Sequence, residues 1–194
     1  EVGEAYRYCN TNYLLLGMIL EKASGEKLSS LYSKYIFNPL QFESAYYGGD
    51  DPIPEGSVKG YADLYGDGKW AESEFLFRDE LNTADGGIAI NAYETGSFFE
   101  KLMKGEVISS ASLDQMTDWF TLPDGWWDPD YYDMQGGYGI ERFDTPYGMA
   151  VGHTGSIMGF LSNIQYFPEL DATFMMSVNC SSYDGSQRKN IYDA

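Results

Sequence analysis

The sequence of 194 residues contains one histidine and two cysteines, and only twelve basic residues stand against thirty acidic ones. The formal net charge of −18 repels nucleic acids and anionic membrane surfaces, so no nucleic-acid partner is expected. No run of eighteen apolar residues is present, and the first ten residues lack the basic and apolar regions of a signal peptide. We therefore expect no membrane insertion.

The scarcity of cysteine and histidine also disfavours a metal site. Cys9 and Cys180 lack zinc-like spacing and can form at most one disulfide, so two free thiols are favoured and their pairing stays open. Two acidic groups could attract calcium, but a β-turn and a solvated acidic loop are the favoured interpretations. These groups are Asp63, Asp67, Gly68 and Glu74, and Asp124, Asp128, Asp130 and Asp133. No metal or organic cofactor is expected.

Apolar residues are plentiful, at 43% of the chain, and they follow helical spacing in the first two thirds. One of Asn10, Thr11 and Asn12 is predicted to cap a helix that Gly25 ends. A second helix is predicted over 28–36, ending before Asn38 and Pro39. Two more are predicted, one capped by Asn91 and one beginning near Ser110. The apolar faces predicted for the first and third helices are Leu14, Leu15, Met18 and Ile19, and Phe98, Phe99, Leu102 and Met103.

The last third has the alternation and turn residues of an antiparallel meander. Its strands are predicted at 138–143, 148–153, 161–167 and 173–179. Two short strands about a Gly-Asp-Gly turn are predicted in 61–77, and 121–137 is predicted to be an acidic, aromatic surface loop. The expected fold class is α+β, with a mainly helical region at 1–137 and a sheet part at 138–194 that together form one structural unit.

Two short motifs stand at opposite ends of the chain. Tyr8-Cys9-Asn10 opens the stretch NTNYLLLGMILEKASG, and His153-Thr154-Gly155 is predicted to end a strand before Gly159-Phe160. With ADGGIAI between them, these motifs resemble the second and third motifs of the serine β-lactamase and D,D-peptidase superfamily, in its class C-like branch. The resemblance implies a β-lactamase/transpeptidase-like fold and a serine hydrolase related to penicillin-binding proteins, esterases and peptidases. Its substrate would be a small molecule or a peptide.

The resemblance also implies roles for the motif residues. Tyr8 would transfer a proton, the backbone N–H of Ser156 on an edge strand would stabilise the oxyanion, and His153 would recognise the substrate by polar or switchable charge. Substrate orientation would fall to Asn10, Thr154 and Gly155. Because an imidazole titrates near neutrality and a lysine does not, histidine in place of the usual lysine favours esters or amides that need no free C-terminal carboxylate.

The family's Ser-x-x-Lys nucleophile precedes the Tyr-x-Asn motif, and only seven residues precede Tyr8 here. The matches at Ser24–Lys27 and Ser186–Lys189 stand in unsuitable places, so neither is the expected nucleophile. We expect a fragment that lacks the N-terminal helix and strands and is inactive alone. A complementing N-terminal segment or a homo-oligomer could complete it.

Each motif residue also has a structural interpretation. His153 could be bonded to a neighbouring carbonyl, Tyr8 could pack with its hydroxyl in water, and Asn10 could be a helix cap. The alternative function is a non-catalytic ligand-binding or sensor domain on the same fold. The family resemblance alone implies a bacterial-type protein that is secreted or periplasmic.

Overall fold

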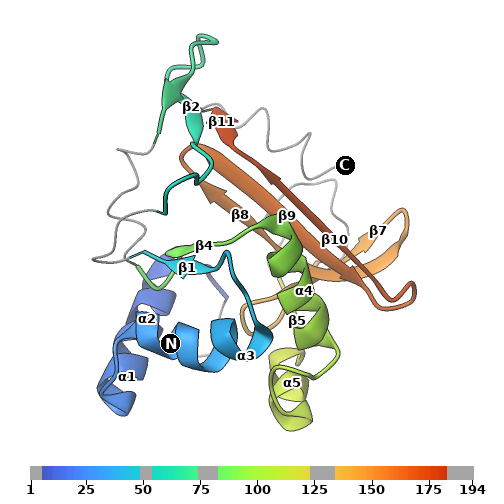
Figure 1. Cartoon of the computed structure of the whole chain (residues 1–194). Coiled ribbons are helices and arrows are strands. Elements are labelled where there is room, and N and C mark those ends of the chain that lie inside the picture. The colour runs from blue at the N-terminus through green and yellow to red at the C-terminus, as the bar shows by residue number, and fades with distance from the viewer. Residues whose placement is uncertain (1–5, 49–53, 74–82, 123–133, 183–194) are drawn as a thin grey trace. The chain divides into compact units, whose positions relative to one another are not determined.

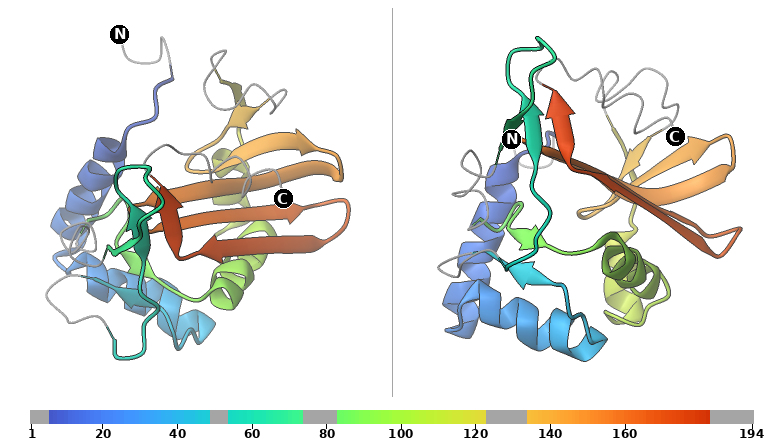
Figure 2. Two further views of the ribbon diagram at one scale, coloured as in Figure 1. Left: turned by 90° about the horizontal axis from the view of Figure 1, so that it is seen from above. Right: turned by 45° about the horizontal axis from the view of Figure 1, so that its top comes forward.

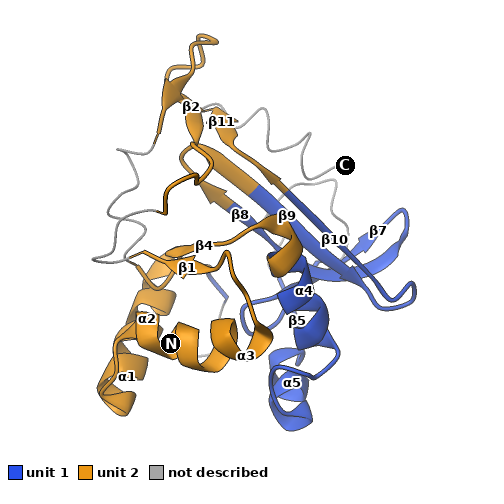
Figure 3. Ribbon diagram, in the orientation of Figure 1, with its two compact units in different colours: residues 1–7, 95–155, 162–176 blue, residues 8–94, 156–161, 177–194 orange. Residues whose placement is uncertain are grey.

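The computed structural model describes residues 6–48, 54–73, 83–122 and 134–182. Within these ranges, no helix is both long enough and apolar enough to cross a bilayer. The chain forms two compact units that each combine separate segments (Figure 3). Unit 1 comprises 1–7, 95–155 and 162–176, and unit 2 comprises 8–94, 156–161 and 177–194. The boundary predicted at Gly137 stays a prediction.

Unit 1 is built on a meander of antiparallel strands (Figure 1). The strands lie in the order β10-β9-β8-β7-β6-β5, and β7 pairs with β8 from Glu141 opposite Gly152 to Thr145 opposite Gly148. Their bounds are β5 (Phe120–Thr121), β6 (Gln135–Gly136), β7 (Glu141–Thr145), β8 (Gly148–Ile157), β9 (Phe160–Phe167) and β10 (Ala172–Val178). The predicted meander is confirmed. The predicted loop at 121–137 is wrong at its ends, because Thr121 pairs with Gln135.

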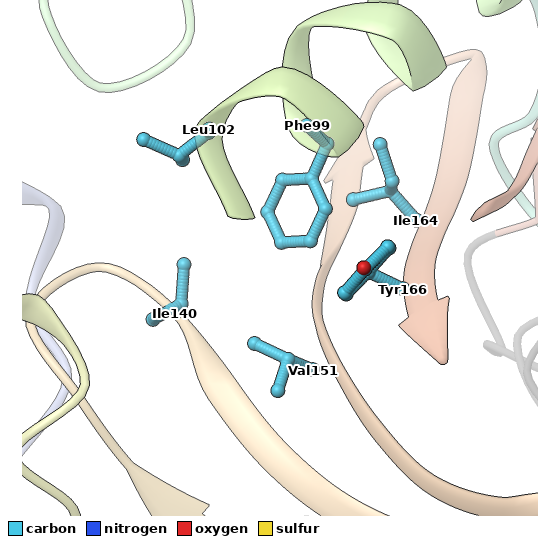
Figure 4. Close-up of a cluster of buried hydrophobic side chains, with 6 residues drawn as sticks. All are labelled: Phe99, Leu102, Ile140, Val151, Ile164 and Tyr166. Atoms are coloured by element: carbon cyan, nitrogen blue, oxygen red, sulfur yellow. The ribbon is translucent and has the colours of Figure 1, made fainter. Parts of the chain in front are cut away.

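Helix α4 (Ala92–Met103) packs one apolar face on this sheet. Phe99 and Leu102 are buried with four residues from the strands and the turn before β7 (Figure 4). These are Ile140, Val151, Ile164 and Tyr166. The predicted face is confirmed, since the periodicity of α4 places Phe98 and Met103 beside the same cluster. The short helix α5 (Ser110–Met116) begins where predicted, with Ser109 accepting a hydrogen bond from the Ser112 N–H.

Unit 2 gathers three short helical segments beside a two-stranded pair (Figures 1 and 2). These are α1 (Asn10–Ser24), α2 (Leu28–Tyr32) and α3 (Asn38–Leu40), with β1 (Tyr46–Tyr47) paired to β4 (Ile88–Ala89). A second sheet joins β11 (Cys180–Ser182), β2 (Tyr61–Asp63) and β3 (Ala71–Glu72). The predicted hairpin of β2 and β3 is confirmed.

Two predictions for the first helices are wrong. Helix α1 ends at Gly25 with φ of 72° as predicted, but Cys9 is its N-cap and makes no side-chain capping bond. The chain also does not leave the helical state before Asn38, because a π turn over Ser33–Phe37 leads into α3. Pro39 lies within α3, and the chain leaves the helical state only at Gln41, whose φ is 58°.

The packing predicted for the apolar face of α1 is wrong as well. Leu15, Met18 and Ile19 are each more than half exposed, and Leu14 is only partly buried.

A carboxylate in unit 2 ties the loop before β1 to the start of α4. Glu94 accepts hydrogen bonds from the backbone N–H of Glu43 at 2.9 Å and the Ser44 hydroxyl at 2.6 Å. Asn91 caps α4 as predicted, accepting from the Glu94 N–H at 2.7 Å. Partial burial pushes the pKa of the Glu94 carboxyl up, but the hydrogen bonds from Ser44 and Glu43 outweigh it and hold that pKa below its ordinary value.

The depressed pKa predicts an acid-sensitive contribution to stability. Because the folded protein holds this carboxylate ionised to lower pH than the unfolded chain does, its stabilisation is present above the unfolded pKa of about 4.3 and is lost as pH falls through the folded pKa. Glu94→Gln should cost about 1 kcal/mol at pH 7 and reduce the acid dependence below pH ~4.5. Thermal unfolding between pH 3 and 7 measures both effects, with exposed Glu55→Gln as control. Equal acid dependence in the two variants would contradict the assignment.

Candidate active site

The predicted site residues fall in both units. Unit 2 holds Tyr8, Asn10 and Ser156, and unit 1 holds His153, Thr154 and Gly155. Along the chain they form two sets, because only Cys9 separates Tyr8 from Asn10 and a single strand, β8, carries the other four. The meeting of the two sets across one cleft stays a prediction.

Tyr8 and Asn10 flank the residue at which the chain turns into α1. Cys9 is extended, with φ of −154° and ψ of 119°, and its carbonyl accepts a hydrogen bond from the Asn12 N–H at 3.0 Å. Residues on either side of an extended residue point to the same side of the chain, so the phenol and the amide are expected on one side. Tyr8 is 37% exposed, and its ring centre lies 6.2 Å from that of Tyr13.

The structural interpretation of Asn10 as a helix cap is wrong. Asn10 is the first residue of α1 and is exposed, while Cys9 takes the N-cap position. No side chain at the N-cap position bonds this helix end. Cys9 and Cys180 are not joined in a disulfide, in agreement with the interpretation favoured from the sequence.

The His-Thr-Gly motif lies inside a strand, and the prediction that the strand ends there is wrong. Strand β8 continues to Ile157, between β7 and β9 in the sheet order. The predicted edge strand is also wrong for the first half of β8, which pairs with β7 up to Gly152. Among the described residues, the pairing of β8 with β7 ends at Gly152. The motif therefore lies in the half of β8 that extends beyond β7.

His153 is half-buried and makes a local hydrogen bond to the main chain. Its Nδ1 lies 2.6 Å from the carbonyl oxygen of Thr154. A carbonyl oxygen can only accept, so Nδ1 is the donor nitrogen in this contact. The carbonyl contact expected from the structural interpretation is present, and it orients the imidazole.

Two glycines beside His153 and Thr154 allow β9 to approach β8 closely. A Cβ on Gly152 would overlap the carbonyl oxygen of Ile164, and a Cβ on Gly155 would overlap the Ser162 hydroxyl. Larger residues at either position would push the strands apart. Ser162 was not singled out from the sequence, because a glycine signals a close approach without naming the partner.

The turn that follows Ser156 is held within unit 2. Gly159, with φ of 90°, donates its N–H to the buried Ser181 hydroxyl at 2.7 Å. A Cβ on Gly60 would lie 2.5 Å from the Phe160 ring. These contacts fix the β8–β9 turn, while Ser156 itself is exposed on β8. Ser181 and Gly60 also escaped sequence reasoning, since they are distant in the chain.

The two calcium sites considered from the sequence find no support in the described residues. Asp63 accepts hydrogen bonds from the N–H groups of Tyr65, Asp67 and Gly68, so its carboxylate closes its own turn. No group of three or more histidine, cysteine or acidic residues in the described ranges could hold a metal ion. Glu74 and the acidic, aromatic residues of 123–133 lie outside the described residues.

Of the two internal Ser-x-x-Lys matches, the one within the described residues is not placed as a nucleophile. The Ser24 hydroxyl donates to the Leu20 carbonyl at 2.7 Å and accepts from the Glu26 N–H at 3.1 Å. Ser24 is therefore engaged at the C-terminal end of α1. The second match, at Ser186–Lys189, lies outside the described residues.

A shallow open pocket of about 370 Å³ in unit 1 lies elsewhere. Its lining combines apolar and polar side chains from α5 and the turns around it, and none of the predicted site residues contributes to it. Its residues are Ile108, Ser112, Gln115, Met116, Asp118 and Tyr138.

Comparison with known proteins assigns the chain to one family. The sequence pattern described as Beta-lactamase matches residues 1–194. The chain belongs to the Beta-lactamase family. The expected α+β class and the resemblance to this superfamily are thereby confirmed.

Three similar proteins are instructive. The chain is 39% identical over 59 residues to a D-aminopeptidase of Cereibacter sphaeroides, a match that covers 30% of this chain and 11% of that protein. Its fold matches D-amino acid amidase from Ochrobactrum anthropi SV3 with a TM-score of 0.84 and 22% identity, over 98% of this chain and 56% of that one.

The third is the octameric penicillin-binding protein homologue from Pyrococcus abyssi, with a TM-score of 0.77 and 26% identity, over 92% of this chain and 40% of that one. The chain thus spans about half the length, or less, of these proteins.

The close approach at Gly155 predicts a specific double-mutant result. Gly155→Ala should destabilise the protein by about 1–3 kcal/mol, because the new methyl group meets the Ser162 hydroxyl. Adding Ser162→Ala should recover most of the loss, since the remaining Ser162 Cβ lies 3.7 Å away, at ordinary contact distance. Urea unfolding of the single and double variants measures the coupling. Gly86→Ala, where no atom lies within 4 Å of the added Cβ, is the control. Additive losses would contradict the contact.

Proposed function

We propose that this chain is part of a serine hydrolase that cleaves D-amino-acid amides, peptides or small esters through an acyl-enzyme. Membership of the Beta-lactamase family carries the proposal. The ordered Tyr8-Cys9-Asn10 and His153-Thr154-Gly155 motifs support it, as do the named activities of the D-aminopeptidase and the D-amino acid amidase. The class C-like branch is part of the same proposal.

The reaction assigns a task to each motif residue. A serine oxygen adds to the substrate carbonyl carbon, the bond to the alcohol or amine leaving group breaks, and water then releases the acid. The Tyr8 phenol passes a proton to the leaving group, and the Ser156 N–H stabilises the oxyanion. The amide of Asn10 and the β8 residues Thr154 and Gly155 orient the substrate. The proposed nucleophile lies in polypeptide outside Glu1–Ala194, and Ser24 does not serve in its place because its hydroxyl is engaged at a helix end.

His153 sets the substrate preference in this proposal. The Nδ1 contact to the Thr154 carbonyl engages one ring nitrogen with the main chain. In a neutral ring the other nitrogen is an acceptor, whereas a lysine in its place would only donate. A neutral acceptor gives a free substrate carboxylate no lasting attraction. Amides and esters without that carboxylate are therefore the proposed substrates.

The decisive experiment uses the complete translation product of the encoding gene beside Glu1–Ala194 alone. The complete product should react with a fluorescent fluorophosphonate and hydrolyse D-amino-acid amides and small esters, while Glu1–Ala194 alone should stay unlabelled. Absence of labelling and turnover, with retained ligand binding, would instead support the sensor alternative. Rapid turnover of β-lactams with no action on esters or D-amino-acid amides would contradict the role given to His153.

The proton-transfer role of Tyr8 predicts a defect in turnover. In the complete product, Tyr8→Phe should lower kcat by about 10²-fold or more and change KM by only a few-fold, because the ring stays while its proton is lost. Tyr13→Phe, whose ring centre lies 6.2 Å from that of Tyr8, is the matched control and should keep its kcat. Steady-state kinetics on a small ester measures both. Equal kcat in the two variants would remove Tyr8 from the mechanism.

The setting of the protein is a further part of the proposal. We place it outside the cytoplasm, in the periplasm or secreted, by family resemblance, and cell fractionation tests this. The octameric homologue from Pyrococcus abyssi supports assembly into a homo-oligomer, which native mass measurement tests.

A further inference from the structure

The turn between β8 and β9 is held by a hydrogen bond to a strand that is distant in the chain. The backbone N–H of Gly159 donates to the Ser181 hydroxyl at 2.7 Å. Ser181 is the middle residue of β11, is 8% exposed, and pairs opposite the fully buried Ala62 of β2. Figure 3 shows the end of β8, the start of β9 and β11 within the same compact unit. Strand pairing therefore fixes the position of the acceptor.

A second contact restricts Gly159. Its φ is 90°, and an added Cβ would overlap the Ser73 hydroxyl. Ser73 itself is anchored, because its N–H donates to the Gly60 carbonyl at 2.9 Å. Gly60 in turn approaches the next residue of the turn, since a Cβ on Gly60 would lie 2.5 Å from the Phe160 ring. The close packing leaves the backbone of the turn little room to move.

The two serines beside Gly159 are both buried, but their hydroxyls differ in what they do. Ser73 is 0% exposed, and its Oγ has no hydrogen-bond partner among the described residues. Removal of that hydroxyl leaves no other group unsatisfied, whereas removal of the Ser181 hydroxyl leaves a buried N–H without its acceptor. Of the two serines, Ser181 is therefore the one that holds the turn by a directional bond.

This turn follows the proposed oxyanion donor closely. Ser156 precedes Gly159 by three residues and lies near the end of β8. Because the described pairing of β8 with β7 ends at Gly152, the backbone at Ser156 is supported by β9 and by the turn. A donor to an oxyanion has to point at the place where charge develops before it develops. A turn free to shift would move this donor beyond the tolerance of about 0.5 Å that such sites have.

We propose that Ser181 is a positioning residue for the Ser156 N–H. Its buried hydroxyl does not touch the substrate but acts through the Gly159 N–H, which holds the β8–β9 turn and with it the end of β8. The inference rests on the proposed function, which gives the Ser156 N–H its task. The hold on the turn requires no catalysis, so it is measured separately from turnover.

Amide hydrogen exchange measures the hold on the turn. In the complete translation product, Ser181→Ala should speed exchange in the peptide that spans 156–161 by about tenfold or more, because Gly159 loses its acceptor. Ser73→Ala is the matched control, since Ser73 is buried beside the same glycine and should leave this exchange unchanged. Ser181→Thr keeps a hydroxyl and should restore the slow exchange. Mass spectrometry of the peptide provides the rates.

Steady-state kinetics on a small ester measures the positioning role. Ser181→Ala should lower kcat by about tenfold and leave KM within a few-fold, because a misplaced donor weakens stabilisation mainly in the transition state. Ser73→Ala should keep its kcat, and Ser181→Thr should recover most of it. Expressing kcat per fluorophosphonate-labelled site removes any contribution from unfolded protein. Should Ser181→Ala fail to fold, Ser181→Cys takes its place, with intermediate effects expected because sulfur is a weak acceptor.

The outcomes separate this inference from the hydrolase proposal. Unchanged exchange at 156–161 in Ser181→Ala would show that the hydroxyl does not hold the turn. Faster exchange with unchanged kcat, or equal losses of kcat in Ser181→Ala and Ser73→Ala, would overturn the positioning role and leave the hydrolase proposal intact. A complete product that neither labels nor turns over before any substitution contradicts the proposed function, and the positioning role falls with it.

Discussion

Burial on both faces of β8 fixes which side of the sheet each motif residue occupies. Val151 packs with the α4 cluster, whereas Ala150 packs with Phe143 and Phe167 in a separate cluster. Successive side chains of a strand point to opposite faces, so His153 shares the face of Val151, and Thr154 shares that of Ala150. A slip of one residue would exchange the two and also remove Val151 from the α4 cluster. The arrangement of the candidate motif thus depends on apolar packing just before it.

The presence of glycine at positions 152 and 155 has a structural explanation that is independent of any substrate. Gly152 and Gly155 lie where β9 comes close enough for a Cβ to overlap Ile164 or Ser162. Where a strand residue donates its backbone N–H to a substrate, the close approach of a neighbouring strand restricts the movement of that backbone. The hydrogen bond at Gly159 after Ser156 and the contact at Gly155 before it therefore serve one purpose in the proposed mechanism, the positioning of a donor before charge develops.

The parts of the fold that were predictable are those in which local pattern and tertiary packing agree. Asn91 caps α4, and Phe99 and Leu102 repeat at the helical period, so local sequence and core formation favour the same helix. The meander was predictable for the same reason. Helix α1 was predictable in position but not in packing, because periodicity identifies apolar residues and says nothing of whether they are buried. The π turn before Asn38 inserts an extra residue into a helical turn, which no periodicity indicates.

For the candidate site, the sequence was sufficient for motif residues that are neighbours in the chain and insufficient for their supports. Ser162 contacts Gly155 where β9 approaches β8, and Ser181 accepts a hydrogen bond from Gly159, which lies 22 residues away in the chain. Neither serine belongs to a motif. His153 shows how the two levels combine. The residue type supplies an imidazole, and the hydrogen bond to the Thr154 carbonyl is what makes Nδ1 the donor nitrogen to the main chain. A lysine has no second nitrogen to divide between the main chain and a substrate, and this difference underlies the proposed separation of amide and ester substrates from those recognised by a free carboxylate.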